Sequence, residues 1–118
     1  ETVSVNEVPE ESMILDLGHR SIEDLVRRLG QCRTVVWNGP LGAFEISPFD
    51  HATNILGREA ARLTRERVLM SVAGGGDTIA ALANAGVAEQ FSYVSTAGGA
   101  FLEWLEGKTL PGVTALLR

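Results

Sequence analysis

Short apolar runs alternate with amphipathic segments along the chain. The runs are MILDL (13–17), TVVW (34–37), VLMSVA (68–73) and FSYVSTA (91–97), and each precedes a segment whose apolar residues recur every three or four positions. Short apolar runs between turn residues are typical of strands, and a period of about 3.6 residues is typical of amphipathic helices. The pattern therefore predicts about four strand–helix units.

Caps and glycines mark the ends of the predicted helices. Ser21 and Asp24 match a capping box for the first helix, which Gly30 would end. Ser47 and Pro48 are typical of the N-cap and first residue of the second helix. The other expected stops are the basic stretch 62–67, Gly86 and Gly107. The residues expected to face the core are Ile22, Leu25, Val26 and Leu29 in the first helix, Phe49, Ala52, Ile55, Leu56, Ala60 and Leu63 in the second, Ile79, Leu82 and Ala83 in the third, and Phe101, Trp104 and Leu105 in the fourth.

The strand pattern also indicates the fold class. Nearly continuous apolar strands are typical of sheets buried on both faces, and strands separated by helices run parallel with right-handed crossovers. We therefore predict an α/β fold: a three-layer αβα sandwich around a parallel, Rossmann-like sheet. In such a sheet, ligands bind beyond the carboxyl ends of the strands, where the loops of the last three units would meet.

Composition and charge narrow the function. The 118 residues, 45% hydrophobic and 21% charged, have the profile of one globular domain. The net charge of −5 argues against broad contact with nucleic acid or an anionic membrane. No apolar run is long enough to span a bilayer, so we expect a cytoplasmic protein. The single cysteine, Cys32, excludes an internal disulfide, and we expect its thiol to pack beside a strand.

Three consecutive glycines follow the third apolar run, in VLMSVAGGGDTIAALANAG. Gly74, Gly75 and Gly76 at the start of a helix would form a phosphate-binding turn, because bare backbone N–H groups and the helix dipole both attract anions. Asp77 would then hold a Mg²⁺ that bridges phosphate oxygens. The alternative is a tight turn with Asp77 as N-cap. The residues Asp77, Thr78 and Ile79 match neither a Walker A loop nor a dinucleotide-binding fingerprint.

The two other glycine loops are open to two interpretations each. In WNGPLGAFE, residues 39–42 would form a wall for a flat ring and Glu45 would accept hydrogen bonds from sugar hydroxyls; alternatively, the loop is a connection in which Trp37 and Phe44 belong to the core. In STAGGA, the alternatives are a second anion site and a closely packed helix start, and the second is favoured.

The sequence contains no constellation of nucleophile, acid and base. His19 and His51 lack a nearby carboxylate or cysteine in metal-ligand spacing. Phosphoryl transfer needs none of these groups, because positioning and positive charge catalyse it. The positive charge is missing, however: Lys108 is the single lysine, and no arginine adjoins a glycine loop.

Several motifs resemble the phosphoglycerate kinase family. The stretches VVWNGPLGAFE, GGGDT and YVSTAGGAFLEWLEGKTLPGV closely resemble the C-terminal end of that enzyme, and VPEESMILDLG resembles the segment that leads into it. The resemblance runs from about Val8 to Val113, in the same order and with similar gaps. Departures are Ala97, where the family often has glycine, Phe101, where a small residue is common, and His19 and Arg20, where proline and lysine are frequent.

The resemblance implies a two-lobed, Mg²⁺-dependent glycolytic kinase that transfers a phosphoryl group between 1,3-bisphosphoglycerate and ADP, giving 3-phosphoglycerate and ATP. Its C-terminal lobe binds the nucleotide. The residues that would bind nucleotide are Ile14 and Leu15 with Gly42 at the adenine, Asn38 near the phosphate path, Glu45 at the ribose, and Gly74, Gly75, Gly76, Asp77 and Thr78 at the phosphates, with Asp77 near Mg²⁺. The catalytic residues would be Gly98 and Gly99, which open the helix that faces the transferred group.

The chain lacks the segments that carry the family's glycerate-binding lobe and its lysine-bearing GGAKV type of motif. We therefore expect residues 1–118 to be part of the nucleotide-binding lobe, its C-terminal half, and to have no kinase activity alone. The alternatives are a nucleotide-binding or regulatory module without catalysis and a purely structural or interaction domain. An incomplete parallel sheet would also expose a strand edge, through which a dimer could form.

Overall fold

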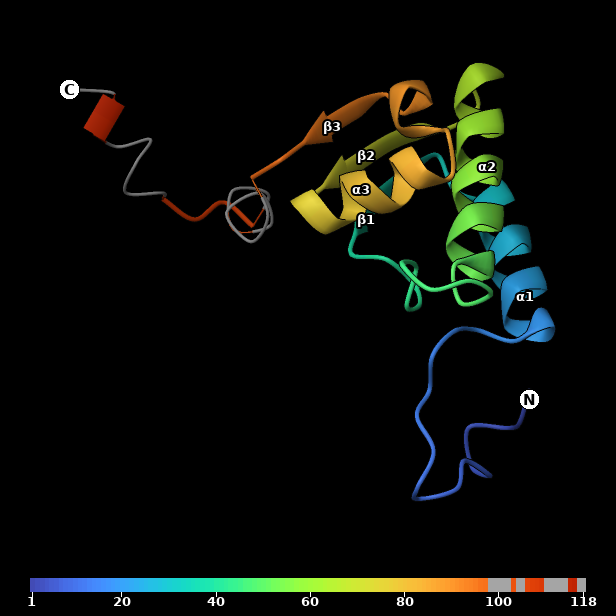
Figure 1. The fold of residues 1–118 in the computed structure, drawn as a ribbon. Coiled ribbons are helices and arrows are strands. Elements are labelled where there is room, and N and C mark those ends of the chain that lie inside the picture. Colours follow the sequence, from blue (N-terminus) through green and yellow to red (C-terminus); the bar gives the residue numbers. More distant parts are fainter. Residues whose placement is uncertain (98–102, 104–105, 110–114, 117–118) are drawn as a thin grey trace.

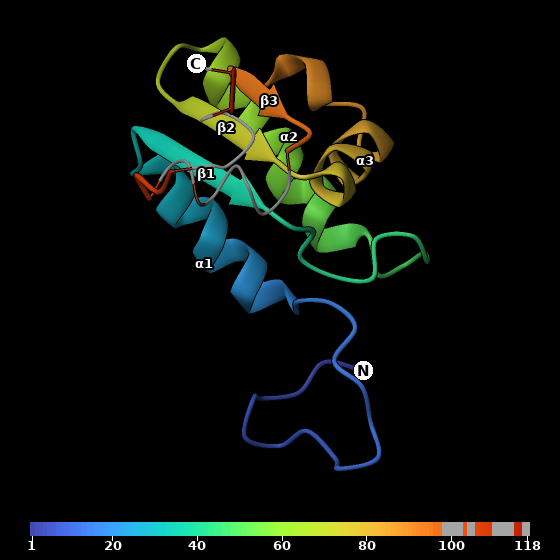
Figure 2. The ribbon, with the colours of Figure 1, turned by 90° about the vertical axis from the view of Figure 1, so that its left-hand side faces the viewer.

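The computed structural model describes residues 1–97, 103, 106–109 and 115–116. In these residues three helices and three strands form a compact unit, from which residues 1–18 extend as an irregular arm (Figures 1 and 2). The elements are α1 (His19–Gly30), β1 (Thr34–Asn38), α2 (His51–Arg65), β2 (Met70–Gly74), α3 (Gly76–Asn84), the short 3-10 helix η1 (Ala88–Gln90) and β3 (Tyr93–Ser95).

The strands form a parallel sheet in the order β1-β2-β3. The register pairs Val36 with Val72 and Val72 with Tyr93. Strands that follow one another in the sequence are therefore neighbours in the sheet. Helix α2 connects β1 to β2, and α3 with η1 connects β2 to β3. The predicted α/β class with a parallel sheet is therefore confirmed.

The predicted first strand, MILDL, is wrong. Met13 and Ile14 are 80% and 74% exposed, and the segment belongs to the irregular arm. An apolar run becomes a strand where a neighbouring strand pairs with its backbone, and here the carbonyl of Leu15 instead accepts a hydrogen bond of 2.9 Å from the N–H of Ala43 in the loop after β1. Periodicity reports apolar character, and it does not report whether a pairing partner exists.

Helices cover one face of the sheet in the described part of the chain, so the predicted three layers are two there. Val35 and Trp37 of β1 pack against the helices, whereas Val36, Met70 and Tyr93 on the other face are 47%, 58% and 59% exposed. Right-handed crossovers explain the arrangement, because strands added in one direction place their connecting helices on one side. The predicted fourth helix, with Phe101, Trp104 and Leu105, lies outside the described residues.

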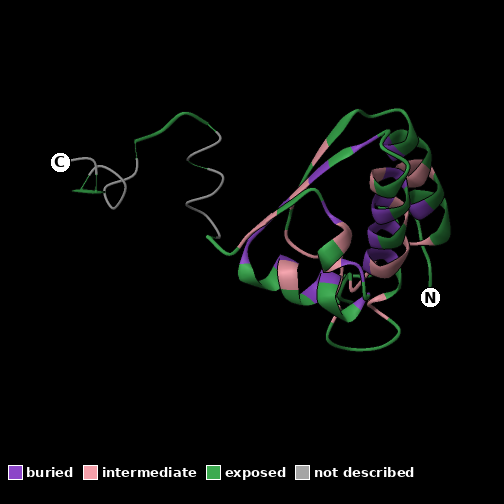
Figure 3. Ribbon diagram, turned by 90° about the horizontal axis from the view of Figure 1, so that it is seen from above, coloured by how far each residue is buried: buried purple, intermediate pink, exposed green. Residues whose placement is uncertain are grey.

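The core is centred on α2, which packs against β2, α1 and α3 and is buried along much of its length (Figure 3). The predicted face of α2 is confirmed for four residues, and three further residues on a second face are buried as well. A Cβ at Gly57 would lie 3.2 Å from Leu82 of α3, which shows how closely the two helices pack. The buried residues of α2 are Ala52, Thr53, Leu56, Gly57, Ala60, Ala61 and Leu63.

Two predicted helix starts are wrong. Helix α1 begins at His19, so Ser21 lies inside its first turn and Asp24 pairs with arginines of the next turn in place of a capping box. Helix α2 begins at His51, because turns bonded from Ile46 to Ala43 and from Phe49 to Ile46 occupy the chain before it. The predicted core face of α1 is confirmed, since Ile22 and Leu29 are buried and Leu25 and Val26 pack against the core.

The predicted stripe of α3 is confirmed at Leu82, whereas Ile79 is half-buried and the prediction for Ala83 is wrong. Thr78, Ala81 and Leu82 are buried, whereas Ala83 is exposed. The helix ends as predicted at Gly86, whose φ is +77°. The N–H of Gly86 bonds to the carbonyl of Ala83, and the N–H of Val87 bonds to that of Leu82, which is the Schellman pattern of helix termination.

The end of α2 repeats this pattern with an arginine in the glycine position. The N–H of Arg67 bonds to the carbonyl of Thr64 and that of Val68 to the carbonyl of Leu63. Arg67 adopts a φ of +62°, the left-handed region that residues with a Cβ rarely occupy. Helix α2 is therefore terminated at a cost in backbone strain.

We predict that Arg67→Gly raises the free energy of unfolding by about 1 kcal/mol, because glycine has no Cβ to clash in the left-handed conformation. The matched control is Arg58→Gly, at an exposed position inside α2, which should lower it by about 1 kcal/mol. Urea unfolding followed by circular dichroism measures both. A loss of stability in both variants would mean that Arg67 does not hold this conformation in solution.

Candidate functional site

The carboxyl ends of the three strands meet at one edge of the sheet. The register places Asn38, the last residue of β1, beside Gly74, and Gly74 beside Ser95. The loops that follow these residues therefore start side by side (Figure 1). This edge is where the sequence predicts the binding residues.

Gly75 joins the sheet to α3 in a single residue. Its N–H donates a hydrogen bond of 2.8 Å to the carbonyl of Ser95, and its φ of +100° turns the chain into the helix. Gly74, the last residue of β2, is buried. Of the three glycines predicted to bind an anion, Gly74 is therefore part of the sheet, and the N–H of Gly75 is already bonded to the neighbouring strand.

The donors that remain free lie one residue further on. Gly76, Asp77 and Thr78 form the first turn of α3, and their N–H groups have no acceptor among the described residues, because the first intrahelical bond runs from Ile79 to Gly75. A Cβ built on Gly76 meets no described atom within 4 Å outside its chain neighbours and the nearby backbone of its own helix, so the space beside Gly76 is open. The start of α3 can therefore receive an anion. The N–H groups that are free to bind it belong to residues 76–78, whereas the sequence predicted residues 74–76.

Asp77 is the second residue of α3 and is exposed. Gly75 occupies the N-cap position, so the alternative of Asp77 as N-cap is wrong. Its carboxylate has no ion-pair or hydrogen-bond partner in the described part of the chain. The same part contains no group of three or more metal-ligating side chains. A lone carboxylate suits Mg²⁺ held mainly by phosphate oxygens and water.

The hydroxyl of Thr78 ties two of the loops together. Thr78 is 1% exposed, and its Oγ1 accepts a hydrogen bond of 2.5 Å from the N–H of Gly39. The carbonyl of Gly39 in turn accepts a hydrogen bond of 2.6 Å from the indole of Trp37. Trp37 packs edge-on against Phe91, so it belongs to the core. Because the Thr78 side chain is buried, its N–H is the group best placed to meet an anion.

The loop after β1 meets the N-terminal arm. The hydrogen bond from Ala43 to Leu15 brings Leu15 and Gly42 together, with the exposed Ile14 beside them and the exposed Glu45 further along the loop. A Cβ on Gly42 would lie 2.7 Å from the carbonyl oxygen of Leu15. Close backbone packing therefore accounts for this glycine, whatever ligand the loop meets.

Asp16 is a residue that the sequence analysis missed. Its Oδ2 accepts a hydrogen bond of 3.1 Å from the N–H of Ala52 at the start of α2. Its Oδ1 is buried and has no hydrogen-bond partner among the described residues. The signal in the sequence is an acid in the middle of the apolar run MILDL. Asp16 anchors the arm to the helix that follows the loop.

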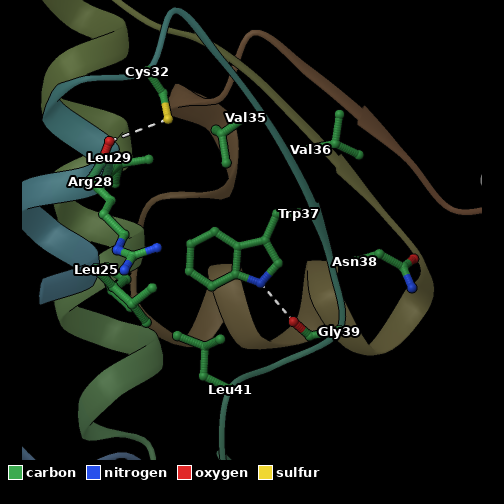
Figure 4. Close-up of a pocket in the computed structure, with 11 residues that line it drawn as sticks. Leu25, Arg28, Leu29, Cys32, Val35, Val36, Trp37, Asn38, Gly39 and Leu41 are labelled. Atoms are coloured by element: carbon green, nitrogen blue, oxygen red, sulfur yellow. Dashed lines mark hydrogen bonds between the residues drawn. The ribbon is translucent and has the colours of Figure 1, made fainter. Parts of the chain in front are cut away.

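A hollow of about 350 Å³ lies between α1 and the outer edge of β1 (Figure 4). Its walls are largely aliphatic, with the indole of Trp37 lying across it. Asn38 and Gly39 line its end nearest the glycine turn. Cys32 lines it too, but is exposed, so the prediction of a packed thiol is wrong. The lining residues are Leu25, Arg28, Leu29, Cys32, Val35, Val36, Trp37, Asn38, Gly39, Leu41 and Leu56.

Two predicted site residues, Gly98 and Gly99, lie outside the described residues. Before them, the N–H of Ala97 donates to the hydroxyl of Ser95. None of the helices in the described part of the chain is long and apolar enough to cross a membrane.

Comparisons with known proteins identify the family. The family model described as phosphoglycerate kinase matches residues 1–108. A phosphoglycerate kinase of Chelativorans sp. (strain BNC1) is 64% identical over 116 residues, which cover 98% of this chain and 29% of that protein. One of Sphingopyxis alaskensis is 67% identical over 115 residues, with coverages of 98% and 29%.

A solved structure agrees with the sequence comparisons. Phosphoglycerate kinase from Coxiella burnetii superposes with a TM-score of 0.83 at 42% identity, covering 98% of this chain and 28% of that one. The chain thus spans about 29% of the length of the curated relatives it matches. With the family model, the sequence relatives and the fold in agreement, the chain belongs to the phosphoglycerate kinase family.

Proposed function

We propose that this chain forms the C-terminal half of the nucleotide-binding lobe of a cytoplasmic phosphoglycerate kinase. In that role it holds Mg-ADP or Mg-ATP while a phosphoryl group passes between 1,3-bisphosphoglycerate and ADP. The observation that carries the proposal is the open start of α3, where the N–H groups of Gly76, Asp77 and Thr78 have no acceptor among the described residues. Phosphate is the anion that such a turn suits best.

The packing around the turn supports this assignment. The bond from Gly75 to Ser95 fixes the turn to the sheet, and the bond from Gly39 to Thr78 fixes it to the neighbouring loop. Donors held in this way need no rearrangement when the phosphate arrives, which lowers the cost of binding. The positive end of the nine-residue helix adds its attraction.

Asp77 is the residue that would hold Mg²⁺. Its carboxylate is exposed and lies in the same helical turn as the free N–H groups. When bound, Mg²⁺ would neutralise charge on the phosphate oxygens. Without the metal, the Asp77 carboxylate would repel the phosphates, so its presence at an anion-binding turn favours a metal-bound nucleotide.

The remaining nucleotide contacts follow from the arm and the loop after β1. Ile14, Leu15 and Gly42 would border the adenine, and their proximity supports this grouping. Glu45 would accept hydrogen bonds from the ribose hydroxyls. Asn38, at the end of β1, would lie beside the phosphate path, and Gly98 and Gly99 would face the transferred group.

The charges of this chain favour binding without chemistry when it acts alone. Phosphoryl transfer requires cations around the moving group. The arginines at the ends of α1 and α2 lie at the opposite edge of the sheet, because the helices of such units run antiparallel to the strands. The rest of the family's protein would supply the missing cations. The predicted dimer gains no support from the comparisons, although β1 pairs on one side only within the described residues.

We predict that Gly76→Ala weakens binding of Mg-ADP by about tenfold or more, because its methyl group would enter the open space beside the residue that carries the first free N–H group. The matched control is Gly30→Ala, at the end of α1, where a Cβ also meets no atom within 4 Å. Both variants should stay folded. Amide NMR titrations with Mg-ADP measure the affinity and locate the shifts, which we expect between Gly74 and Thr78.

Equal affinities for Gly76→Ala and Gly30→Ala would contradict a phosphate site at this turn. A folded native spectrum without shifts would mean that the turn does not bind nucleotide in this chain alone, and it would favour the structural alternative.

A second prediction concerns the metal. Asp77→Asn should weaken binding of ADP in the presence of Mg²⁺ and leave binding without Mg²⁺ unchanged or stronger, because the substitution removes a metal ligand and also a negative charge near the phosphates. Calorimetric titrations with and without Mg²⁺ distinguish the two effects. The same loss under both conditions would argue that Asp77 supports the fold and does not hold the metal.

We further predict no turnover of 1,3-bisphosphoglycerate and ADP by the purified chain. A coupled assay for ATP formation, with a complete phosphoglycerate kinase as positive control, tests this. Turnover above the background of an Asp77→Asn preparation would overturn the conclusion that the cations must come from elsewhere.

A further inference from the structure

Arginines gather at the amino edge of the sheet, opposite the glycine turns. Helices α1 and α2 both end at this edge with basic last turns, and β1 starts there. The chain carries a net charge of −5, so the gathering does not reflect a generally basic surface. The residues are Arg27, Arg28, Arg33, Arg62, Arg65 and Arg67.

Four of these arginines have partners. Arg27 and Arg28 share the carboxylate of Asp24. Arg65 donates to the side-chain oxygen of Gln90. The fourth, Arg62, lies between two glutamates: it pairs with Glu66 at 2.8 Å and with Glu59, where its hydrogen bonds lower the pKa of that carboxyl group.

The guanidinium groups of Arg33 and Arg67 have no ion-pair or hydrogen-bond partner among the described residues. Both residues line the same open hollow, of about 620 Å³, together with Thr64 and Ser92. None of the described residues that line it is acidic, and the others are Val68, Leu69 and Met70.

A chain of hydroxyl groups leaves one donor, the hydroxyl of Ser92, unused at this hollow. Thr64 gives its proton to the carbonyl of Ala60 at 2.7 Å, so in its 2.7 Å contact with Ser71 it must accept. The oxygen of Ser71 accepts the N–H of Ser92 at 3.1 Å, and the oxygen of Ser92 accepts the N–H of Ser71 at 3.0 Å. The hydroxyl proton of Ser92 therefore has no acceptor among the described residues.

Arg67, which lines the hollow, has a left-handed backbone conformation. Its φ of +62° is strained for a residue with a Cβ, and glycine would satisfy the same helix end. Strain of this kind is often found at functional positions. The carbonyls of Leu63 and Thr64 at this end of α2 are already bonded to the N–H groups of Val68 and Arg67, which reduces the negative partial charge that Arg67 meets there.

We propose that this hollow, lined by Arg33, Arg67 and Ser92, binds a phosphate dianion. Two guanidinium groups offer planar pairs of N–H donors that match phosphate oxygens, and the Ser92 hydroxyl adds a further donor. The site lies at the edge of the sheet opposite the start of α3, so it is separate from the proposed nucleotide site and does not depend on it. Either free phosphate or the phosphate group of a small ester would satisfy the donors.

The test is an amide NMR titration of the complete 118-residue chain with sodium phosphate, compared with sodium chloride at equal ionic strength. We expect saturable shifts at Arg67, Val68 and Ser92 with phosphate alone. Arg33→Gln and Arg67→Gln should each weaken binding about tenfold. Arg67→Lys should retain part of the affinity, because lysine keeps the positive charge but lacks the planar pair of N–H donors of a guanidinium group. The control, Arg58→Gln, removes an exposed arginine elsewhere on α2 and should change nothing.

Two results would overturn the proposal: no saturable shift at these amides in the native chain, or titrations of Arg33→Gln and Arg67→Gln that match that of Arg58→Gln. The unfolding free energy of each variant without phosphate shows whether the fold is intact. A titration with phenyl phosphate identifies the source of the dianion. Tighter binding than that of inorganic phosphate indicates an ester whose apolar part contacts Val68 and Met70, and equal binding indicates recognition of the dianion alone.

Discussion

The hydrogen bond from the N–H of Gly75 to the carbonyl of Ser95 fixes the arrangement of the carboxyl edge. It extends the pairing of β2 and β3 by one residue beyond Gly74, and in that residue the chain turns into α3. A φ of +100° makes the turn so short, and glycine is the residue that adopts it at little cost. With the Gly75 amide committed to the sheet, the free donors begin at Gly76, so the sheet itself determines where an anion can bind.

The second constraint is the contact between the loop after β1 and the start of α3. The buried hydroxyl of Thr78 accepts the amide of Gly39, and the carbonyl of Gly39 accepts the indole of Trp37. The core residue Trp37 is thereby linked to the loop after β1, and that loop is linked to the start of α3. The arm is linked in a similar way, through Asp16 at the start of α2 and Leu15 at the loop. Segments far apart in the sequence are thus held at the same edge by few, specific hydrogen bonds.

Local chemistry made part of this fold predictable. The strands β1 and β2, the buried face of α1 and the helix end at Gly86 follow from apolar spacing and from the glycine that a Schellman motif requires. The start of α2 was predicted too early, at Pro48, because the turns that precede it are fixed by backbone hydrogen bonds that spacing does not report. Ala83 was assigned to the core in place of Thr78, since a threonine that is buried to accept a hydrogen bond looks polar in the sequence.

The geometry of the candidate site was likewise predictable only in part. A run of glycines before a helix indicates an anion-binding turn, but it does not show which amide the neighbouring strand will take, and that depends on the pairing of β3. Asp16 was missed because its role comes from a contact with a helix 36 residues away in the sequence. Long-range contacts of this kind become visible in the structure alone.

The alternation of strand and helix also separates the charges of the molecule. Because the helices run antiparallel to the strands, their basic last turns lie at the amino edge, while the free N–H groups of α3 and the carboxylate of Asp77 lie at the carboxyl edge. An anion at the carboxyl edge is therefore met by backbone dipoles beside an acidic side chain, which favours phosphates that carry a divalent cation. An anion at the proposed amino-edge site would be met by guanidinium groups, with no carboxylate among the described residues that line the hollow, which would favour a dianion without a metal. If both proposed sites bind phosphate, the same parallel topology gives the two edges different preferences for it.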